Sequence, residues 1–271
     1  MIKARPMSAP ARVALPSDHQ RSPDRPDAPA PATVHTAPAR MTAVLMVLGA
    51  ASQLPLGLLH PHHAQPNDSR AAFAEYAHSH DWVMVHLGQY MGALLVTIGL
   101  VTLAVTHTRR AGIAGQLGRI AAITALVSTA VFAVQMALDG VALKTAVDHW
   151  ASVSSDQRAS AFDVADALRS LEKGLSALFH LNNGLTLLAL GLATLTRRGT
   201  SIVGWLGYLA GVGFLIEALL TAQTGFSQRA GTFALIPTLL LIAFLIGAAR
   251  TIWRGPTDLS PSRPDGSRQR P

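Results

Sequence analysis

The chain has 271 residues, of which 49% are hydrophobic and only 14% are charged. It contains no cysteine, which excludes disulfides, thiolate metal ligands and cysteine nucleophiles. The formal net charge is +7, but the basic residues gather in tails and in loops between apolar runs, where they set membrane orientation. We therefore expect no nucleic-acid binding.

The two ends of the chain differ in composition from its middle. Residues 1–40 repeat Pro and Ala and contain no apolar run long enough for a signal-peptide core or a helix face. Residues 255–271 have a similar composition. We expect both ends to be disordered cytoplasmic tails and residues 41–254 to form one membrane domain.

The middle of the chain contains six long apolar runs. One of them, residues 82–106, has 25 residues and no formal charge. At about 1.5 Å per residue it exceeds the roughly 30 Å hydrocarbon core of a bilayer, and it must be helical because lipid offers the backbone no hydrogen-bond partners. The sequence therefore predicts an all-α bundle of six transmembrane helices, at residues 41–59, 82–106, 120–143, 175–195, 202–222 and 232–249.

Two loops contain amphipathic segments. Residues 70–77 are predicted to form a short helix with Asp68 or Ser69 as its N-cap. A second helix is expected at residues 156–172, where Phe162, Ala165, Leu168 and Leu171 recur every three residues. Tyr76 and Trp82 are residue types that favour the membrane interface, so we expect both there.

The distribution of basic residues predicts the orientation. Sixteen Lys and Arg residues lie in the tails and in the two loops on the same side, and six lie on the other side beside eight acidic residues. Basic residues are retained in the cytoplasm, and six crossings return the chain to the side where it began. We expect a multi-pass protein of the cell (inner) membrane with both termini in the cytoplasm.

Two pairs of glycines have the spacing that allows helix backbones to approach closely. Gly88 and Gly92 form one pair, and Gly207 and Gly211 form the other. They predict close helix packing, and either face is a candidate surface for a homo-oligomer within the lipid bilayer.

The polar residues of the spans concentrate in the half that faces outward in this orientation. Four ionisable residues lie about 5 to 9 Å below the predicted outer boundaries, and amides accompany them. A charged group at mid-membrane costs roughly 2.5 to 3.5 kcal/mol, so such residues mark candidate sites with partners inside the bundle. The set is His86, Gln89, Gln135, Asp139, His180, Asn182, Asn183 and Glu217.

Three interpretations of this polar layer remain open. It is a structural hydrogen-bond cluster, or binds a small ligand or ion, in a non-enzymatic protein. Alternatively it serves a membrane-embedded enzyme, with a divalent metal ion at His86, Asp139, His180 and Glu217, or with haem iron held by His86 and His180. In the third interpretation Asp139 or Glu217 carries a proton or cation in a small transporter.

The first loop is rich in histidine. Its spacings HxHH and HxHD can hold copper or zinc, although flexible histidine tracts bind metals weakly in general. The residues are His60, His62, His63, His78 and His80, followed by Asp81. A solvated loop and a pH-sensing loop are the alternatives.

No Ser-His-Asp arrangement, Walker loop or dinucleotide fingerprint is present in the sequence. Residues 160–220 contain a loop-helix glutamate, Glu172, before a span, then a basic turn, then a tryptophan-glycine step at Trp205 and Gly207. With the LHP at residues 59–61 and the W-x-x-x-H at residues 82–86, this pattern resembles a family of uncharacterised bacterial polytopic membrane proteins with a domain of unknown function. The resemblance implies about six helices and assigns no catalytic residue.

Overall fold

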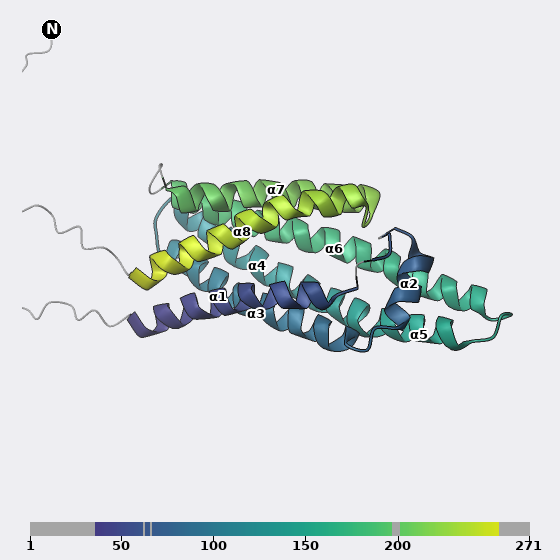
Figure 1. Cartoon of the computed structure of the whole chain (residues 1–271). Coiled ribbons are helices and arrows are strands. Elements are labelled where there is room, and N and C mark those ends of the chain that lie inside the picture. The colour runs from purple at the N-terminus through teal and green to yellow at the C-terminus, as the bar shows by residue number, and fades with distance from the viewer. Residues whose placement is uncertain (1–35, 62, 66, 197–200, 255–271) are drawn as a thin grey trace, which may run out of the picture. The chain divides into compact units, whose positions relative to one another are not determined.

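The computed structural model describes residues 36–61, 63–65, 67–196 and 201–254. Within these ranges the regular structure is entirely helical, which confirms the predicted fold class (Figure 1). The predictions for residues 1–35 and 255–271 lie outside the described residues. The first helix, α1 (Thr36–Leu59), begins inside the predicted tail, so residues 36–40 belong to a helix.

Six helical segments of the described chain are long and apolar enough to cross a membrane. They make the chain a multi-pass membrane protein. They comprise α1, α3 (Trp82–Thr108), α4 (Ile113–Ala137) with its continuation, α6 (Arg158–Leu195), α7 (Ile202–Thr224) and α8 (Gln228–Arg254).

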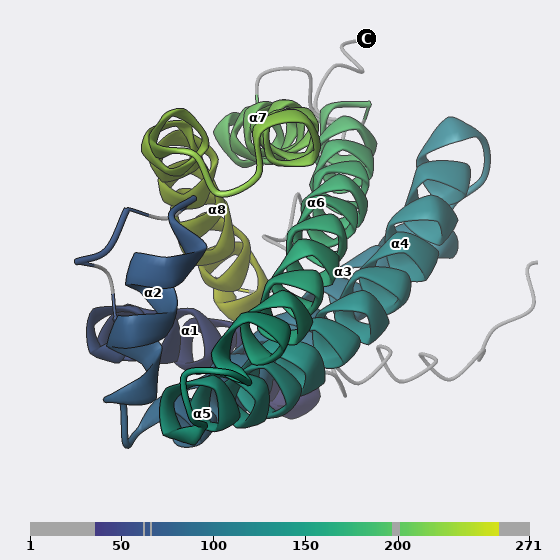
Figure 2. The same ribbon diagram turned by 90° about the vertical axis from the view of Figure 1, so that its right-hand side faces the viewer.

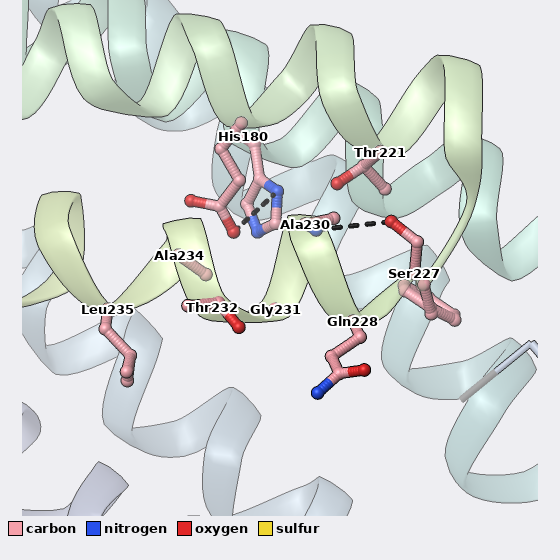
Figure 3. Close-up of a pocket in the computed structure, with 11 residues that line it drawn as sticks. His180, Thr221, Ser227, Gln228, Ala230, Gly231, Thr232, Ala234 and Leu235 are labelled. Atoms are coloured by element: carbon pink, nitrogen blue, oxygen red, sulfur yellow. Dashed lines mark hydrogen bonds and ion pairs between the residues drawn. The ribbon is translucent and has the colours of Figure 1, made fainter. Parts of the chain in front are cut away.

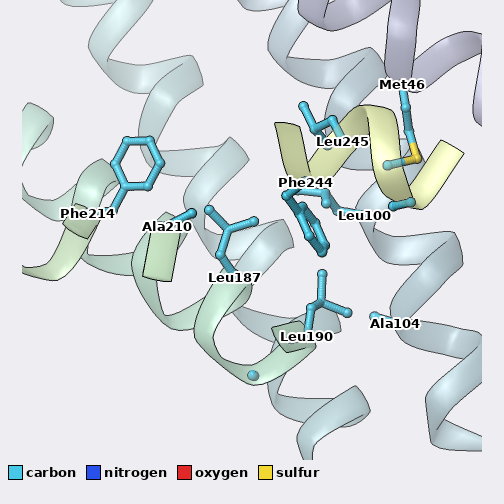
Figure 4. Packing of buried hydrophobic residues seen from close by; sticks show 12 residues of the cluster. Met46, Leu100, Ala104, Leu187, Leu190, Ala210, Phe214, Phe244 and Leu245 are labelled. Carbon is cyan, nitrogen blue, oxygen red and sulfur yellow. The ribbon is translucent and has the colours of Figure 1, made fainter. Parts of the chain in front are cut away.

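The six long helices pack as a closed ring. Each of them contacts the next along the chain, and α8 returns to pack on α1 (Figures 1 and 2). A core drawn from all six helices fills the half of the ring near the start of α1. Its largest fully buried members include Met46, Leu187, Leu190, Phe244 and Leu245 (Figure 4).

Close approach of the helices depends on the predicted glycines. A Cβ atom on Gly92 would meet the side chains of Ser52 and Gln53 in α1, and one on Gly211 would meet the backbone of Leu188 in α6. Gly88 likewise faces α1, and Gly207 faces α6 and α8. Both glycine pairs are therefore covered by helices of the same chain, and the homo-oligomer stays a prediction.

Two helices run past the expected membrane boundaries. The predicted loop helix at residues 156–172 is the first half of α6, a single helix of 38 residues, about 57 Å long. In the same way α4 continues through the π-helix η1 (Leu138–Leu143) into α5 (Lys144–Ser152). The prediction of a separate second amphipathic helix was wrong, because α6 continues through Gly174 without a break. The change from polar to apolar residues at 172–175 marks a change of surroundings and not the end of a helix.

The extensions form a small second core, here called the head, with the short helix α2 (Ser69–Ala77). As predicted, Asp68 caps α2, accepting a hydrogen bond from the Ala71 amide at 3.0 Å. Tyr76 and Trp82 are 6% and 1% exposed, so protein covers both rings, and their predicted position at the membrane interface stays a prediction. Both rings are inside the head, with Phe73, Leu143, Val147, Trp150 and Ala165.

Candidate functional site

The central feature of the site is a buried pair of His86 and Asp139. His86 lies in the second turn of α3 and Asp139 in η1, and their residues are 1% and 5% exposed. The His86 Nε2 atom lies 2.8 Å from Asp139 Oδ2. Its Nδ1 atom lies 2.7 Å from the backbone oxygen of Trp82, one turn earlier.

These two contacts fix the form of the imidazole. A backbone oxygen can only accept, so Nδ1 of His86 carries the hydrogen and donates it to Trp82. In the neutral ring the lone pair is then on Nε2, which faces a carboxylate oxygen. The short Nε2–Oδ2 contact therefore requires a shared proton, and a metal ion can take the place of that proton. An imidazole that donates its other N–H to a carbonyl is the usual form of a metal-binding histidine.

The π-helix η1 is what presents Asp139 to this position. A π-turn widens the helix and leaves backbone groups to bond outside it, and such turns often occur at functional sites. Here the indole Nε1 of Trp82 donates to the backbone oxygen of Asp139 at 2.9 Å. The bond ties the start of α3 to η1 beside the His86–Asp139 pair.

A third candidate ligand comes from the first loop. One ligand atom each from His60, His86 and Asp139 lies within 4.8 Å of the other two. The Nδ1 atom of His60 bonds the backbone oxygen of Pro61 at 2.9 Å, which places the lone pair of the neutral ring on Nε2. Burial lowers the pKa of His60, and the neutral imidazole that this favours is the form that binds metals.

Asp139 has unused capacity at the same point. Its Oδ1 atom is buried and has no hydrogen-bond partner in the described structure. A buried carboxylate oxygen without a partner is costly unless a ligand satisfies it. The oxygen and the two imidazoles together form a three-ligand set, which we call the His60–His86–Asp139 site.

Aromatic rings and a buried ion pair enclose this site. The rings of Trp82 and Tyr76 lie 4.2 Å apart, and His60 lies 4.9 Å from Trp82 between ring centroids. Behind them Arg169 Nη1 lies 3.4 Å from Glu172 Oε2, with side chains 3% and 7% exposed. Arg169 is thus paired with Glu172, and Asp139 is opposed by the proton that it shares with His86. A cation that takes the place of this proton lies against the carboxylate of Asp139.

The other two predicted ligands form a separate pair. Nδ1 of His180 in α6 lies 3.4 Å from Oε1 of Glu217 in α7, and this pair borders a cavity between α6, α7 and α8 (Figure 3). The predicted four-residue metal site is therefore divided into two pairs on different helices. Among the described residues, the group of converging ligand atoms contains His86 and Asp139 and does not include His180 or Glu217. Haem iron held by His86 and His180 stays a prediction.

The predicted histidine loop does not converge as a unit in the described residues. Only His60 joins the site; His63, His78 and His80 are exposed and lie outside the three-ligand set. His62 lies outside the described residues.

Sequence reasoning missed the burial of Arg169 and Glu172. The predicted apolar face of this segment included Leu171, which is 59% exposed. The face that the fold buries runs through Ala161, Ala165, Arg169, Glu172 and Ser176. Their helical spacing was the only sequence signal of this buried face. It was missed because a helix face with two charged residues is normally interpreted as solvent-exposed.

Comparisons of the chain with protein-family models, curated proteins and solved structures found no match. The family resemblance seen in the sequence therefore stays a prediction.

Proposed function

We propose that this is a non-enzymatic protein of the cell (inner) membrane that binds a divalent transition-metal ion, with zinc as the first candidate, from the outer side. The ligands are His60, His86 and Asp139. The excess of Lys and Arg in the tails and their neighbouring loops supports a cytoplasmic position for both termini. The metal site and the head then face outward.

The observation that carries this proposal is the convergence of three ligand atoms within 4.8 Å. Ligands at about 2.0 Å from a tetrahedral zinc ion are about 3.3 Å apart, so modest side-chain shifts complete the site and leave the fourth position to water. Two imidazoles favour zinc or copper over magnesium or calcium, which prefer oxygen ligands.

The surroundings favour binding over catalysis. An open fourth position is also the form of a catalytic zinc site, where a separate base activates the bound water. Of the neighbouring ionisable side chains, Arg169 and Glu172 pair with each other and Tyr76 packs against Trp82. Aromatic rings take up much of the remaining wall.

Zinc binding by the detergent-purified full-length chain without a histidine tag tests the proposal. We expect close to one zinc ion per chain by elemental analysis, and His60→Ala should weaken zinc binding by at least about 10-fold. His63→Ala is the matched control, because His63 is an exposed histidine three residues away that is not part of the site. Absence of bound zinc in the wild type, or equal affinities of the two variants, would contradict the proposal.

A further inference from the structure

A second site of different chemistry lies at the His180–Glu217 pair. The cavity beside it has a volume of about 400 Å³, within the range of sites for small organic ligands. It is formed by α6, the last turns of α7 and the first turns of α8, next to the turn that joins α7 to α8 (Figure 3). Glu217 lies about 10 Å below that turn, since it stands seven positions before Thr224 at the end of α7.

The polar atoms of the pair are not satisfied within the described structure. The side chain of Glu217 is 7% exposed and that of His180 is 17% exposed. Their closest contact, at 3.4 Å, is too long for a good hydrogen bond. Glu217 Oε2 and His180 Nδ1 both lack a hydrogen-bond partner. A buried carboxylate left in this state is stabilised by a ligand that donates hydrogen bonds to it.

The charge of the cavity selects the class of ligand. Among the residues that line it, Glu217 and His180 are the only ionisable ones, and no Lys or Arg is present. The nearby Arg169 stacks on Phe226 at 5.3 Å and pairs with Glu172. Lys173, whose side chain lies against Gly225 in the α7–α8 turn, and Arg229 in the first turn of α8 are basic residues at this end, and neither lines the cavity. A positive charge placed against Glu217 inside the cavity therefore comes from the ligand.

The chemical groups that line the cavity favour an organic cation over a metal ion. A metal ion needs several converging oxygen or nitrogen ligands at about 2.0 to 2.6 Å. This lining offers the carboxylate of Glu217 and the imidazole of His180, and among the described residues neither belongs to a group of three or more converging His, Asp or Glu ligands. The apolar wall comes from Phe226, Ala230, Ala234 and Leu235, and hydroxyl and amide groups lie at Thr221, Ser227, Gln228 and Thr232. A charged amine with an apolar body matches both parts.

We propose that the cavity between α6, α7 and α8 binds a small protonated amine, whose ammonium group donates hydrogen bonds to Glu217 while its apolar part packs against α8. This site is distinct from the metal site and does not depend on it.

Binding of n-hexylammonium, with 1-hexanol as the neutral ligand of equal length, tests the proposal by calorimetry on the full-length chain in lipid nanodiscs. We expect saturable binding of one hexylammonium per chain, and Glu217→Gln should weaken it by at least about 10-fold because the charge-assisted hydrogen bonds are lost. Hexanol should bind more weakly and respond little to this substitution. The control is Asp163→Asn, which removes an exposed carboxylate of α6 outside the cavity and should leave hexylammonium binding unchanged.

A second variant keeps the proposal testable if Glu217→Gln does not fold. Gly231 lines the cavity, and a Cβ atom there would meet nothing within 4 Å, so the side chain of Gly231→Leu starts in open space beside the cavity. We expect it to fold and to bind hexylammonium at least about 10-fold more weakly. Absence of saturable hexylammonium binding, equal affinities for hexylammonium and hexanol, or unchanged affinity in either variant would overturn the proposal. His60→Ala tests the metal site separately, so either proposal can fail alone.

Discussion

Gly140 packs directly against His86. A Cβ atom on Gly140 would lie 2.7 Å from the His86 Cβ atom, closer than side chains approach one another. The absence of a side chain at this position of η1 therefore lets α3 come near enough for His86 to reach Asp139. One turn of the π-helix supplies both the carboxylate and the space that its partner needs.

Gly140→Ala is expected to displace His86 and to weaken zinc binding by at least about 10-fold, because the imidazole and the carboxylate no longer converge. Isothermal titration with zinc measures the effect. Gly174→Ala is the control, since a Cβ atom there meets nothing within 4 Å. That change should leave zinc affinity unaltered and raise the free energy of unfolding by about 0.5 to 1 kcal/mol. Equal zinc affinities in both variants would contradict the structural role of Gly140.

Arg169→Met is expected to lower the free energy of unfolding by roughly 3 to 5 kcal/mol, because Glu172 is then left buried without its partner. The double variant Arg169→Met, Glu172→Met should recover most of that loss, since no unpaired charge remains. Denaturant unfolding in detergent measures both. A double variant as unstable as the single one would show that Arg169 acts mainly through its contacts with the rings of Tyr76 and Phe226.

The stability of the head is expected to fall in alkali. Burial raises the pKa of Tyr76 from 10.0 to about 12. The unfolded chain therefore loses this proton at lower pH than the folded chain does. The stabilisation is fully present below pH 10 and is lost as the pH rises toward 12, a change on the order of 2 kcal/mol. Unfolding measured from pH 8 upward should show a smaller decline in Tyr76→Phe, and an equal decline would contradict the burial effect.

The orientation can be tested with single cysteines, because the native chain has none. Ser154 lies in the exposed connection between α5 and α6, and Ala111 lies in the exposed connection between α3 and α4. We expect a membrane-impermeant maleimide to label Ser154→Cys in intact cells and to label Ala111→Cys only after lysis. The reverse pattern would place the head and the metal site in the cytoplasm.

The sequence alone predicted the six long helices, the short capped helix α2 and the all-α class. It could do so because lipid forces the backbone of each span into a helix, and because length and hydropathy measure that requirement directly. His86, Asp139, His180 and Glu217 were singled out by the cost of placing ionisable groups in a span. The grouping of these residues did not follow from that cost.

Only the tertiary structure decided that His86 pairs with Asp139 and His180 with Glu217, that His60 joins the first pair, and that Arg169 and Glu172 are buried. Hydropathy reports whether a segment lies in lipid or in water, but lipid tails are as apolar as a helix interface, so it does not show which face of a span meets its neighbours. The rotation of each helix is set by close contacts such as that of Gly140 with His86. Such contacts join residues far apart in the chain, and they exist only once the ring of helices has closed.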